Sequence, residues 1–426
     1  MYRQMDYPAA LDYIHGAGRF SSCACLRRIE ALVEELGTDL TGTRFIHVAG
    51  TNGKGSTCAM LESILRAAGY KAGLFTSPYL VDFCERMQID RERISHDRLA
   101  RLTDKVRAAA ERIIGRGVEK PNEFEIVTAI ALEYFIGEKC DFVLWETGLG
   151  GGKDATNVIP PPVLAVITSV SFDHMAQLGD TLPEIAGEKC GIIKNGTPFC
   201  VAGKNPPEVM EVIEDVCARA GVRLVKAGTL SGRETLAGTE LSVDGRCVHL
   251  PLLGKYQLEN AANAVAAAKC LSSLGCGIDE ESIVRGLEAV RWQGRMEVLG
   301  SEPPVILDCA HNVGGFESLL ASVREISGGR EIVALTAMMG DKEHEKCLNM
   351  LAETCSRVYV TGLDMPRCLP PETAARELET AGCVVRVVPE LPAALKTARE
   401  ELKEDELLLI CGSVYLAGTV RAIATE

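Results

Sequence analysis

The chain has 426 residues, of which 47% are hydrophobic and 24% are charged, and its formal net charge is −14. This length exceeds one ordinary hydrophobic core, so we expect about two or three domains. No apolar run approaches the roughly 20 residues of a membrane helix. The acidic balance argues against nucleic acid as the main partner. We therefore expect neither a membrane nor a nucleic acid as partner.

The N-terminus and the cysteines bear on the cellular compartment. Residues 1–6 lack the apolar core of a signal peptide, which predicts a cytoplasmic protein. The 17 cysteines are scattered singly, mostly inside apolar segments, and no Cys-x-x-Cys pair occurs. This pattern is typical of reduced, largely buried thiols rather than of a disulfide framework.

Strand-like apolar runs alternate with helical patterns through the first half of the chain. The expected strands are residues 45–49, 72–76, 142–146, 163–168 and 199–202, and the expected helices include residues 96–116, 125–136 and 206–220. Ser95 is placed to cap the first of these helices. The alternation predicts a mostly parallel sheet with helices on both faces, in which ligands bind at the carboxyl ends of the strands.

A second alternating set begins near residue 305. Its expected strands are residues 305–308, 332–336, 358–361, 384–388 and 407–411, and helices at 257–273 and 280–289 separate the two sets. Residues 294–304 contain glycine, serine and two prolines, so we place a linker there. The predicted fold is α/β: a large N-terminal domain with a mostly parallel sheet at 1–296, then a smaller C-terminal α/β domain at 297–426.

Residues 47–57 read HVAGTNGKGST and join the first expected strand to a helix. Glycines let backbone N–H groups turn toward an anion, and the helix N-terminus adds partial positive charge. Lys54 supplies a full charge, while Ser56 or Thr57 supplies a hydroxyl near a metal. The spacing departs from the common phosphate-loop pattern, because Gly55 separates the lysine from the hydroxyls. The segment predicts nucleotide phosphate binding; the alternative is a tight connection without a ligand.

Other polar residues stand where expected strands or helices end. Glu146 ends a strand, and a carboxylate beside a phosphate loop commonly holds Mg²⁺, although it could be an ordinary strand-end acid. The glycine run 148–152 could approach a ligand closely or be a flexible loop. His174 is either a metal ligand or a buried, hydrogen-bonded histidine. Lys189, near a helix end, is by residue type alone a solvated charge.

The later part of the chain repeats this arrangement. Arg295 lies at the expected linker, where it could reach a phosphate. Residues 308–312 read DCAHN and end one strand, and residues 340–342 and 412–413 follow two others. Polar clusters at the ends of several parallel strands indicate one ligand-facing edge.

Taken together, these motifs resemble the Mur-ligase superfamily and, within it, the folylpolyglutamate synthase and dihydrofolate synthase family. The resemblance runs nearly end to end and in family order, over residues 47–56, 76–80 (TSPYL), 148–151, 154–157 (DATN), 188–194 (EKCGIIK), 294–297 (GRME) and 308–312. It implies a phosphate-loop ATPase domain with a mostly parallel sheet at 1–296 and a smaller Rossmann-like α/β domain at 297–426. It also implies an ATP-dependent ligase of folate biosynthesis and one-carbon metabolism. Such an enzyme joins L-glutamate to tetrahydrofolate or its polyglutamates, to dihydropteroate, or to both, through an acyl phosphate, and releases ADP and phosphate.

The resemblance also implies roles for individual residues. The implied ATP contacts are Gly53, Lys54, Gly55, Ser56, Asn260, Arg295, Asp308 and His311. The implied Mg²⁺ ligands are Ser77, Glu146, His174 and a carbamylated Lys189, with a monovalent cation as a further option. Lys54, Lys189 and His174 are the implied catalytic residues, and Asp154 with Ala155 would meet the pteridine. Carbamylation would turn Lys189 into an acid-like ligand. The resemblance further implies a monomer.

The chain departs from the family pattern at several positions. Gly152 and Lys153 replace an Arg-Leu pair, Asn122 replaces a threonine, and Tyr79 and Tyr256 stand where histidine is frequent. All but the last lie near the expected pterin site. The choice between dihydropteroate, tetrahydrofolate or both therefore stays open, as do polyglutamate length and linkage.

Two alternatives differ in substrate or in activity. A Mur-type ligase of cell-wall synthesis would act on another carboxylate acceptor, but those enzymes carry an additional domain before the phosphate loop, and only 49 residues precede Gly50. A non-catalytic ATP-binding relative would be favoured by the loss of Glu146, His174 or Lys189. All three are present, which favours an active ligase.

Overall fold

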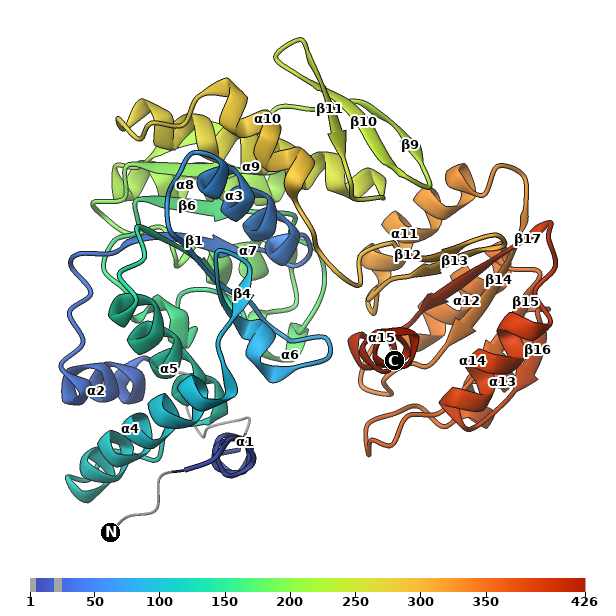
Figure 1. The fold of residues 1–426 in the computed structure, drawn as a ribbon, viewed down its shortest axis with the longest axis horizontal. Coiled ribbons are helices and arrows are strands. Elements are labelled where there is room, and N and C mark those ends of the chain that lie inside the picture. Colours follow the sequence, from blue (N-terminus) through green and yellow to red (C-terminus); the bar gives the residue numbers. More distant parts are fainter. Residues whose placement is uncertain (1–4, 19–24, 426) are drawn as a thin grey trace. The chain divides into compact units, whose positions relative to one another are not determined.

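The computed structural model describes residues 5–18 and 25–425. The chain divides into two compact units, Met1–Thr229 with Glu259–Leu287, and Leu230–Leu258 with Glu288–Glu426, and their elements are labelled in Figure 1. Both units are α/β, as predicted. No helix among the described residues is long and apolar enough to cross a membrane.

The first unit is built on an eight-stranded sheet of order β4-β3-β2-β5-β1-β6-β7-β8. Its strands are β1 Arg44–Ala49, β2 Ala72–Phe75, β3 Met87–Ile89, β4 Glu92–Arg93, β5 Phe142–Glu146, β6 Leu164–Ile167, β7 Phe199–Ala202 and β8 Arg223–Lys226. All neighbours are parallel except the pairs made by β3 and β4 at one edge. The turns after β1, β2, β5 and β6 therefore emerge at the same end of the sheet.

Helices cover both faces of this sheet, as Figure 1 shows for α3, α9 and α10 on one side of β1 and α2, α4 and α5 on the other. Ser95 caps α4 by accepting the Arg98 N–H at 3.2 Å, which confirms the predicted cap. The helices of this unit are α1 Tyr7–His15, α2 Arg27–Leu36, α3 Lys54–Ala67, α4 His96–Gly115, α5 Glu123–Gly137, α6 Met175–Leu178, α7 Leu182–Cys190, α8 Pro207–Ala220, α9 Lys255–Ser273 and α10 Glu280–Ala289, with 3₁₀ helices η1 Phe83–Arg86 and η2 Ala155–Val158. The first four residues of α9 and the last two of α10 fall in the second unit.

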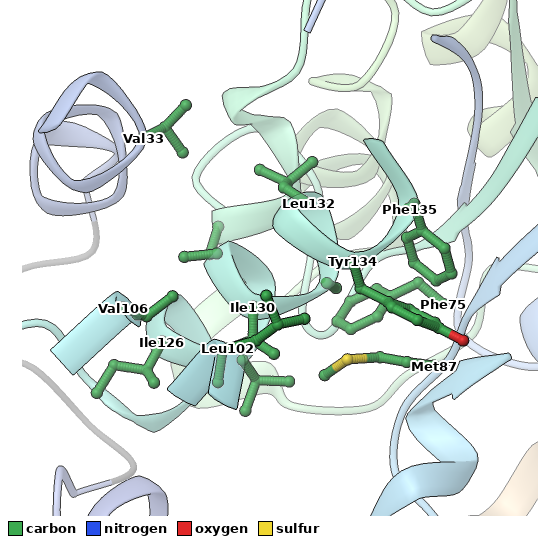
Figure 2. Packing of buried hydrophobic residues seen from close by; sticks show 14 of the residues in the cluster. Val33, Phe75, Met87, Leu102, Val106, Ile126, Ile130, Leu132, Tyr134 and Phe135 are labelled. Atoms are coloured by element: carbon green, nitrogen blue, oxygen red, sulfur yellow. The ribbon is translucent and has the colours of Figure 1, made fainter. Parts of the chain in front are cut away.

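Apolar side chains from the strands and the helices pack together in the core of this unit. Figure 2 shows Phe75 and Met87 of the sheet packed against Leu102 of α4 and Ile130 of α5. A second apolar cluster joins β6 and β7 to α7 and α8. Burial of apolar surface stabilises such contacts by about 25 cal/mol per Å². Every cysteine in the described part of the chain is a free thiol, and most are buried, as expected from their spacing.

The second unit contains a six-stranded sheet of order β12-β13-β17-β14-β15-β16, parallel except for β12, and a three-stranded antiparallel sheet. The strands are β9 Gly232–Thr235, β10 Gly238–Val243, β11 Arg246–Leu250, β12 Glu297–Ser301, β13 Pro304–Leu307, β14 Glu331–Thr336, β15 Arg357–Val360, β16 Val384–Val387 and β17 Glu406–Cys411. The helices are α11 Val313–Ile326, α12 His344–Thr354, α13 Pro371–Thr380, α14 Leu391–Glu400 and α15 Val414–Thr425.

Two parts of this unit differ from the sequence-based expectation. The expected linker at 294–304 contains β12, which pairs antiparallel with β13 and places Val298 opposite Ile306 in the core. Most of the glycines and prolines of residues 294–304 therefore belong to a β-hairpin rather than to a linker. The three-stranded sheet at residues 232–250 was not expected, and it groups with the second unit rather than the first. The domain boundary at 296/297 stays a prediction.

Candidate functional site

The turn after β1 has room only for glycine at two positions. A Cβ on Gly50 would lie 1.8 Å from Thr168 Oγ1, and a Cβ on Gly53 would lie 2.2 Å from Asn260 Oδ1. Gly53 also has φ +85°, a conformation that favours glycine. The fold thus brings Asn260, a predicted ATP contact, against the loop. Helix α3 starts at Lys54, so the N–H groups of its first turn, including Gly55 and Ser56, are oriented for an anion.

The Lys54 side chain folds back onto this loop. Its Nζ donates to the carbonyls of Gly50 at 3.2 Å and Thr51 at 3.1 Å, and it is 4.0 Å from Glu146 Oε1. The ammonium group therefore stands between the phosphate loop and an acid at the end of the neighbouring strand. Phosphate binding by Lys54 stays a prediction.

Glu146 and Ser77 come together beside the loop. Strand pairing sets Glu146 opposite Val48, one residue before β1 ends. The Glu146 carboxylate is buried, and its Oε2 accepts the Ser77 N–H at 3.2 Å. A carboxylate and a hydroxyl are the oxygen ligands that Mg²⁺ prefers, so these two residues fit a Mg²⁺ site.

Lys189 is directed inward from the last turn of α7. Only 3% of the residue is exposed, and Nζ donates to the Gly50 carbonyl at 2.9 Å, the same carbonyl that Lys54 contacts. Burial, and then the positive charge of Lys54, lowers the pKa of Lys189 to about 7. The solvated charge expected from residue type is therefore wrong. The tertiary fold instead places beside the phosphate loop a buried amine, a substantial fraction of which is neutral near pH 7.

The lowered pKa of Lys189 predicts a pH dependence of stability. Between pH 7 and about 10.4, the unfolded chain keeps a lysine proton that the folded chain has lost. The free energy of unfolding of the wild type should therefore rise with pH relative to that of Lys189→Met. Urea unfolding of both proteins at pH 7 and pH 9, in buffer free of CO₂, measures the difference. A pH-independent difference would contradict the buried, neutral amine.

The glycine run at 148–152 packs against the C-terminal end of α7. The Gly152 N–H donates to the Glu188 carbonyl at 2.8 Å, and a Cβ on Gly151 would lie 2.5 Å from the Lys189 carbonyl oxygen. A Cβ on Gly191 would lie 2.3 Å from Gly152 Cα. The run is therefore an ordered loop that needs glycine for close backbone approach, rather than a flexible connection.

Adding one methyl group tests this contact. Gly151→Ala should destabilise the protein by about 1–3 kcal/mol and lower ligase activity, because the clash is with backbone atoms that hold Lys189. Gly187→Ala is the matched control, since this exposed α7 glycine has open space around its Cβ and alanine favours helix. Thermal unfolding and activity of both variants give the comparison. Equal behaviour would contradict the tight packing.

Asp154 orders the loop from inside. Its buried carboxylate accepts the N–H groups of Leu149 at 2.8 Å and Thr156 at 3.0 Å, and also the Thr156 hydroxyl. Burial raises the pKa of Asp154. Ala155 is buried beside it. The oxygens of Asp154 are thus engaged within the loop, so the loop shape depends on this side chain.

Sequence reasoning missed two residues that support the same loop. His47 Nε2 lies 2.9 Å from the Thr156 hydroxyl, and burial lowers the pKa of His47 well below its usual range, which keeps it neutral. Lys194 Nζ donates to the carbonyls of Asn157 at 2.7 Å and Ile159 at 2.5 Å. Both residues belong to motifs noted in the sequence, but nothing local indicated these distant partners.

His174 follows β6 and is the residue immediately before α6, where its backbone is left-handed, with φ 52°. Its side chain is 46% exposed, so the alternative of a buried histidine is wrong. Its Nε2 lies 3.9 Å from Asp173 Oδ1. Two partly exposed apolar side chains, Phe172 and Met175, flank it. Metal ligation by His174 stays a prediction.

Within the second unit, Asp308 organises the other predicted ATP contacts. Its Oδ2 accepts the Tyr256 hydroxyl and the Met296 N–H, both at 2.8 Å. Burial raises the pKa of Asp308, and the charge of Arg295 opposes that shift. Tyr256 therefore holds the Asp308 carboxylate directly.

The two remaining predicted contacts lie close by in sequence. Arg295 Nη1 donates to the Gly294 carbonyl at 3.0 Å, and His311 Nδ1 lies 2.9 Å from the Cys309 carbonyl oxygen. The Cys309 N–H donates to the Gly294 carbonyl at 3.0 Å, which ties the two segments together. Arg295, Asp308 and His311 thus occupy one region of the second unit.

Comparison with known families and proteins adds an independent observation. Residues 48–268 match the family described as Mur ligase middle domain, and residues 294–414 match Mur ligase, glutamate ligase domain. The dihydrofolate synthase/folylpolyglutamate synthase of Bacillus subtilis is 36% identical over 97% of this chain and 98% of its own length. The folylpolyglutamate synthase of Lacticaseibacillus casei is 33% identical over 98% of both chains.

Solved structures agree with these matches. The folylpolyglutamate synthase of Mycobacterium tuberculosis complexed with ADP has a TM-score of 0.91 at 30% identity and covers 99% of both chains. Escherichia coli FolC in complex with DHPP and ADP has a TM-score of 0.87 at 29% identity, over 99% of this chain and 98% of that one.

Proposed function

This chain belongs to the dihydrofolate synthase/folylpolyglutamate synthase family of Mur ligases, and on that premise we propose that it joins L-glutamate to a folate, to dihydropteroate, or to both. The reaction consumes ATP and releases ADP and phosphate. The observation that carries this proposal is the meeting of Lys54 and Lys189 on one carbonyl of the phosphate loop, with Glu146 beside Lys54.

The proposed chemistry has two steps. A carboxylate oxygen of the pterin substrate attacks the γ-phosphorus of ATP, which forms an acyl phosphate and releases ADP. The amino group of glutamate then attacks the acyl carbon, phosphate leaves, and an amide remains. Phosphoryl transfer depends mainly on positioning and electrostatics. Lys54 and the first-turn N–H groups of α3, including Gly55 and Ser56, would hold the transferring phosphates and offset their charge.

The metal site is part of the proposal. Ser77, Glu146 and His174 would hold Mg²⁺, which when bound supplies positive charge to the phosphate oxygens. A monovalent cation remains an additional option. The contacts of Glu146 with Ser77 and Lys54 place a carboxylate beside the phosphate loop and support this assignment.

We further propose that Lys189 is carbamylated. In that reaction the neutral Nζ forms a bond to the carbon of CO₂ and loses a proton to solvent, which leaves an anionic carbamate able to bind the metal. A pKa near 7 supports the proposal, because only the neutral amine is nucleophilic. The proximity of Lys54 would then favour the anionic product.

The remaining assignments are also proposals. Asn260, Arg295, Asp308 and His311 would contact ATP, and the loop containing Asp154 and Ala155 would meet the pteridine. We propose a monomeric, cytoplasmic enzyme that acts on small molecules alone, with a domain boundary at 296/297. The free thiols of the described chain support a reducing compartment.

The test is ADP release by purified protein that depends on glutamate and Mg²⁺, with dihydropteroate and tetrahydrofolate offered separately. Activity with tetrahydrofolate alone identifies a polyglutamate synthase, activity with dihydropteroate alone a dihydrofolate synthase, and activity with both a bifunctional enzyme. If neither substrate supports ADP release, the proposed function is contradicted. Gly152 and Lys153, where the pterin loop departs from the family, would then be examined for a different acceptor.

A further inference from the structure

Asp82, Cys84 and His96 form a side-chain cluster that the proposed ligase reaction does not use. Asp82 caps η1, Cys84 lies within η1, and His96 is the first residue of α4. One carboxylate oxygen, the thiol sulfur and one imidazole nitrogen all lie within 4.8 Å of one another. Among the described residues, no other group of three or more such side chains meets this closely.

Neighbouring groups orient two of the three side chains. Asp82 Oδ1 accepts the Cys84 N–H at 2.7 Å, so its Oδ2 is left facing His96 Nε2 at 3.5 Å. The Tyr7 ring stacks on the imidazole with centroids 3.7 Å apart and planes 5° apart. The Tyr7 hydroxyl also lies 3.5 Å from Asp82 Oδ1. Carboxylate and imidazole are therefore pre-oriented toward each other, which limits the ordering cost of ligation.

The three side chains differ in their exposure to solvent. Cys84 is buried in the apolar core that includes Phe83 and Met87, which fixes the position of its sulfur. The His96 side chain is 55% exposed. The cluster thus has a rigid inner ligand and an outer face through which an ion and a water molecule can enter.

We propose that Asp82, Cys84 and His96 bind a divalent cation of the zinc type, with water as the fourth ligand. A thiolate, an imidazole and a carboxylate form a mixed set that zinc accepts in tetrahedral sites with one open position. Mg²⁺, in contrast, prefers oxygen ligands alone. On binding, the S–H bond of Cys84 breaks, a metal–sulfur bond forms, and the proton passes to solvent.

Such a site would tie together segments on both sides of η1. The chain from β2 to β3 contains both Ser77 and Asp82, while His96 starts α4. A cation that binds only the folded protein would raise its melting temperature. The alternative for the same geometry is an ion pair of His96 with Asp82, stacked on Tyr7, which needs no metal.

Cobalt titration decides between the two. Chelator-treated full-length protein is titrated with Co²⁺, and the cobalt–thiolate charge-transfer absorbance is followed, with Zn²⁺ added as competitor. We expect the charge-transfer band to saturate with one thiolate-bound Co²⁺ per chain, whatever Co²⁺ binds at the proposed Mg²⁺ site, and to disappear in Cys84→Ser. His96→Ala should weaken binding by more than about tenfold. Cys247→Ser, which alters an exposed cysteine on β11, should bind normally, and so should His174→Ala.

Absence of a thiolate band, or a band unchanged in His96→Ala, overturns the proposal and leaves the ion pair. Because Cys84 is buried, Cys84→Ser could lose the fold; His96 is more than half exposed, so its variant keeps the test decisive. Circular dichroism checks the fold of each variant. ADP release is measured separately, so failure at this site is distinguishable from failure of the proposed ligase function.

Discussion

Lys54→Ala is expected to lower the rate of ATP-dependent ligation by about 10²–10³-fold or more at saturating ATP. The Nζ of Lys54 contacts the Gly50 and Thr51 carbonyls and lies 4.0 Å from Glu146 Oε1. Its loss removes the side-chain cation proposed to contact the transferring phosphate. The measurement is the rate of ADP release with the accepted pterin substrate, glutamate and Mg²⁺.

The fold of Lys54→Ala should be intact, because the freed loop carbonyls can be hydrated. Lys204→Ala is a matched control, since that side chain is 80% exposed and its ion pair with Glu259, at 3.8 Å, lies outside the proposed site. The control should keep both rate and stability. Glu146→Ala should resemble Lys54→Ala, because it removes the carboxylate proposed for Mg²⁺. Near-normal turnover in either site variant would refute the assignment of the phosphate and metal residues.

Lys189→Ala is expected to remove ligase activity, and high bicarbonate should not restore it. The side chain is buried, its Nζ donates to the Gly50 carbonyl at 2.9 Å, and its pKa is lowered to about 7. Alanine can neither form a carbamate nor replace the contact with the phosphate loop. The wild type, in contrast, should gain activity when bicarbonate is added to CO₂-free buffer. Wild-type rates in Lys189→Ala would show that the carbamate proposal is wrong.

Carbon-13 NMR with labelled CO₂ can observe the carbamate directly. Lys194 is a matched control, because it is a second lysine with a lowered pKa. Burial lowers the pKa of Lys194 to about 8. Lys194 donates instead to the carbonyls of Asn157 and Ile159. The carbamate signal should vanish in Lys189→Ala and persist in Lys194→Met. A signal that follows Lys194 would move the modification away from the phosphate loop.

Buried parallel strands were predicted well because they appear as short apolar runs. Phe142–Glu146 and Phe199–Ala202 match the expected strands residue for residue, since both faces of such strands are covered and alternation with polar residues is absent. The hairpin containing β12 was missed because glycine and proline in residues 294–304 also mark linkers. The three-stranded sheet at 232–250 was missed because several of its side chains are exposed and polar.

By itself the sequence determined the α/β alternation, the phosphate loop and the family, because these depend on neighbouring residues in the chain. Tertiary structure alone decided that Lys189 is buried against Gly50, 139 residues away, that Asp154 is engaged inside its own loop, and that Asp82, Cys84 and His96 converge. The physical reason is that desolvation and charge–charge interaction depend on distance in space. Residue type and spacing along the chain do not determine how far apart two groups lie in the folded protein.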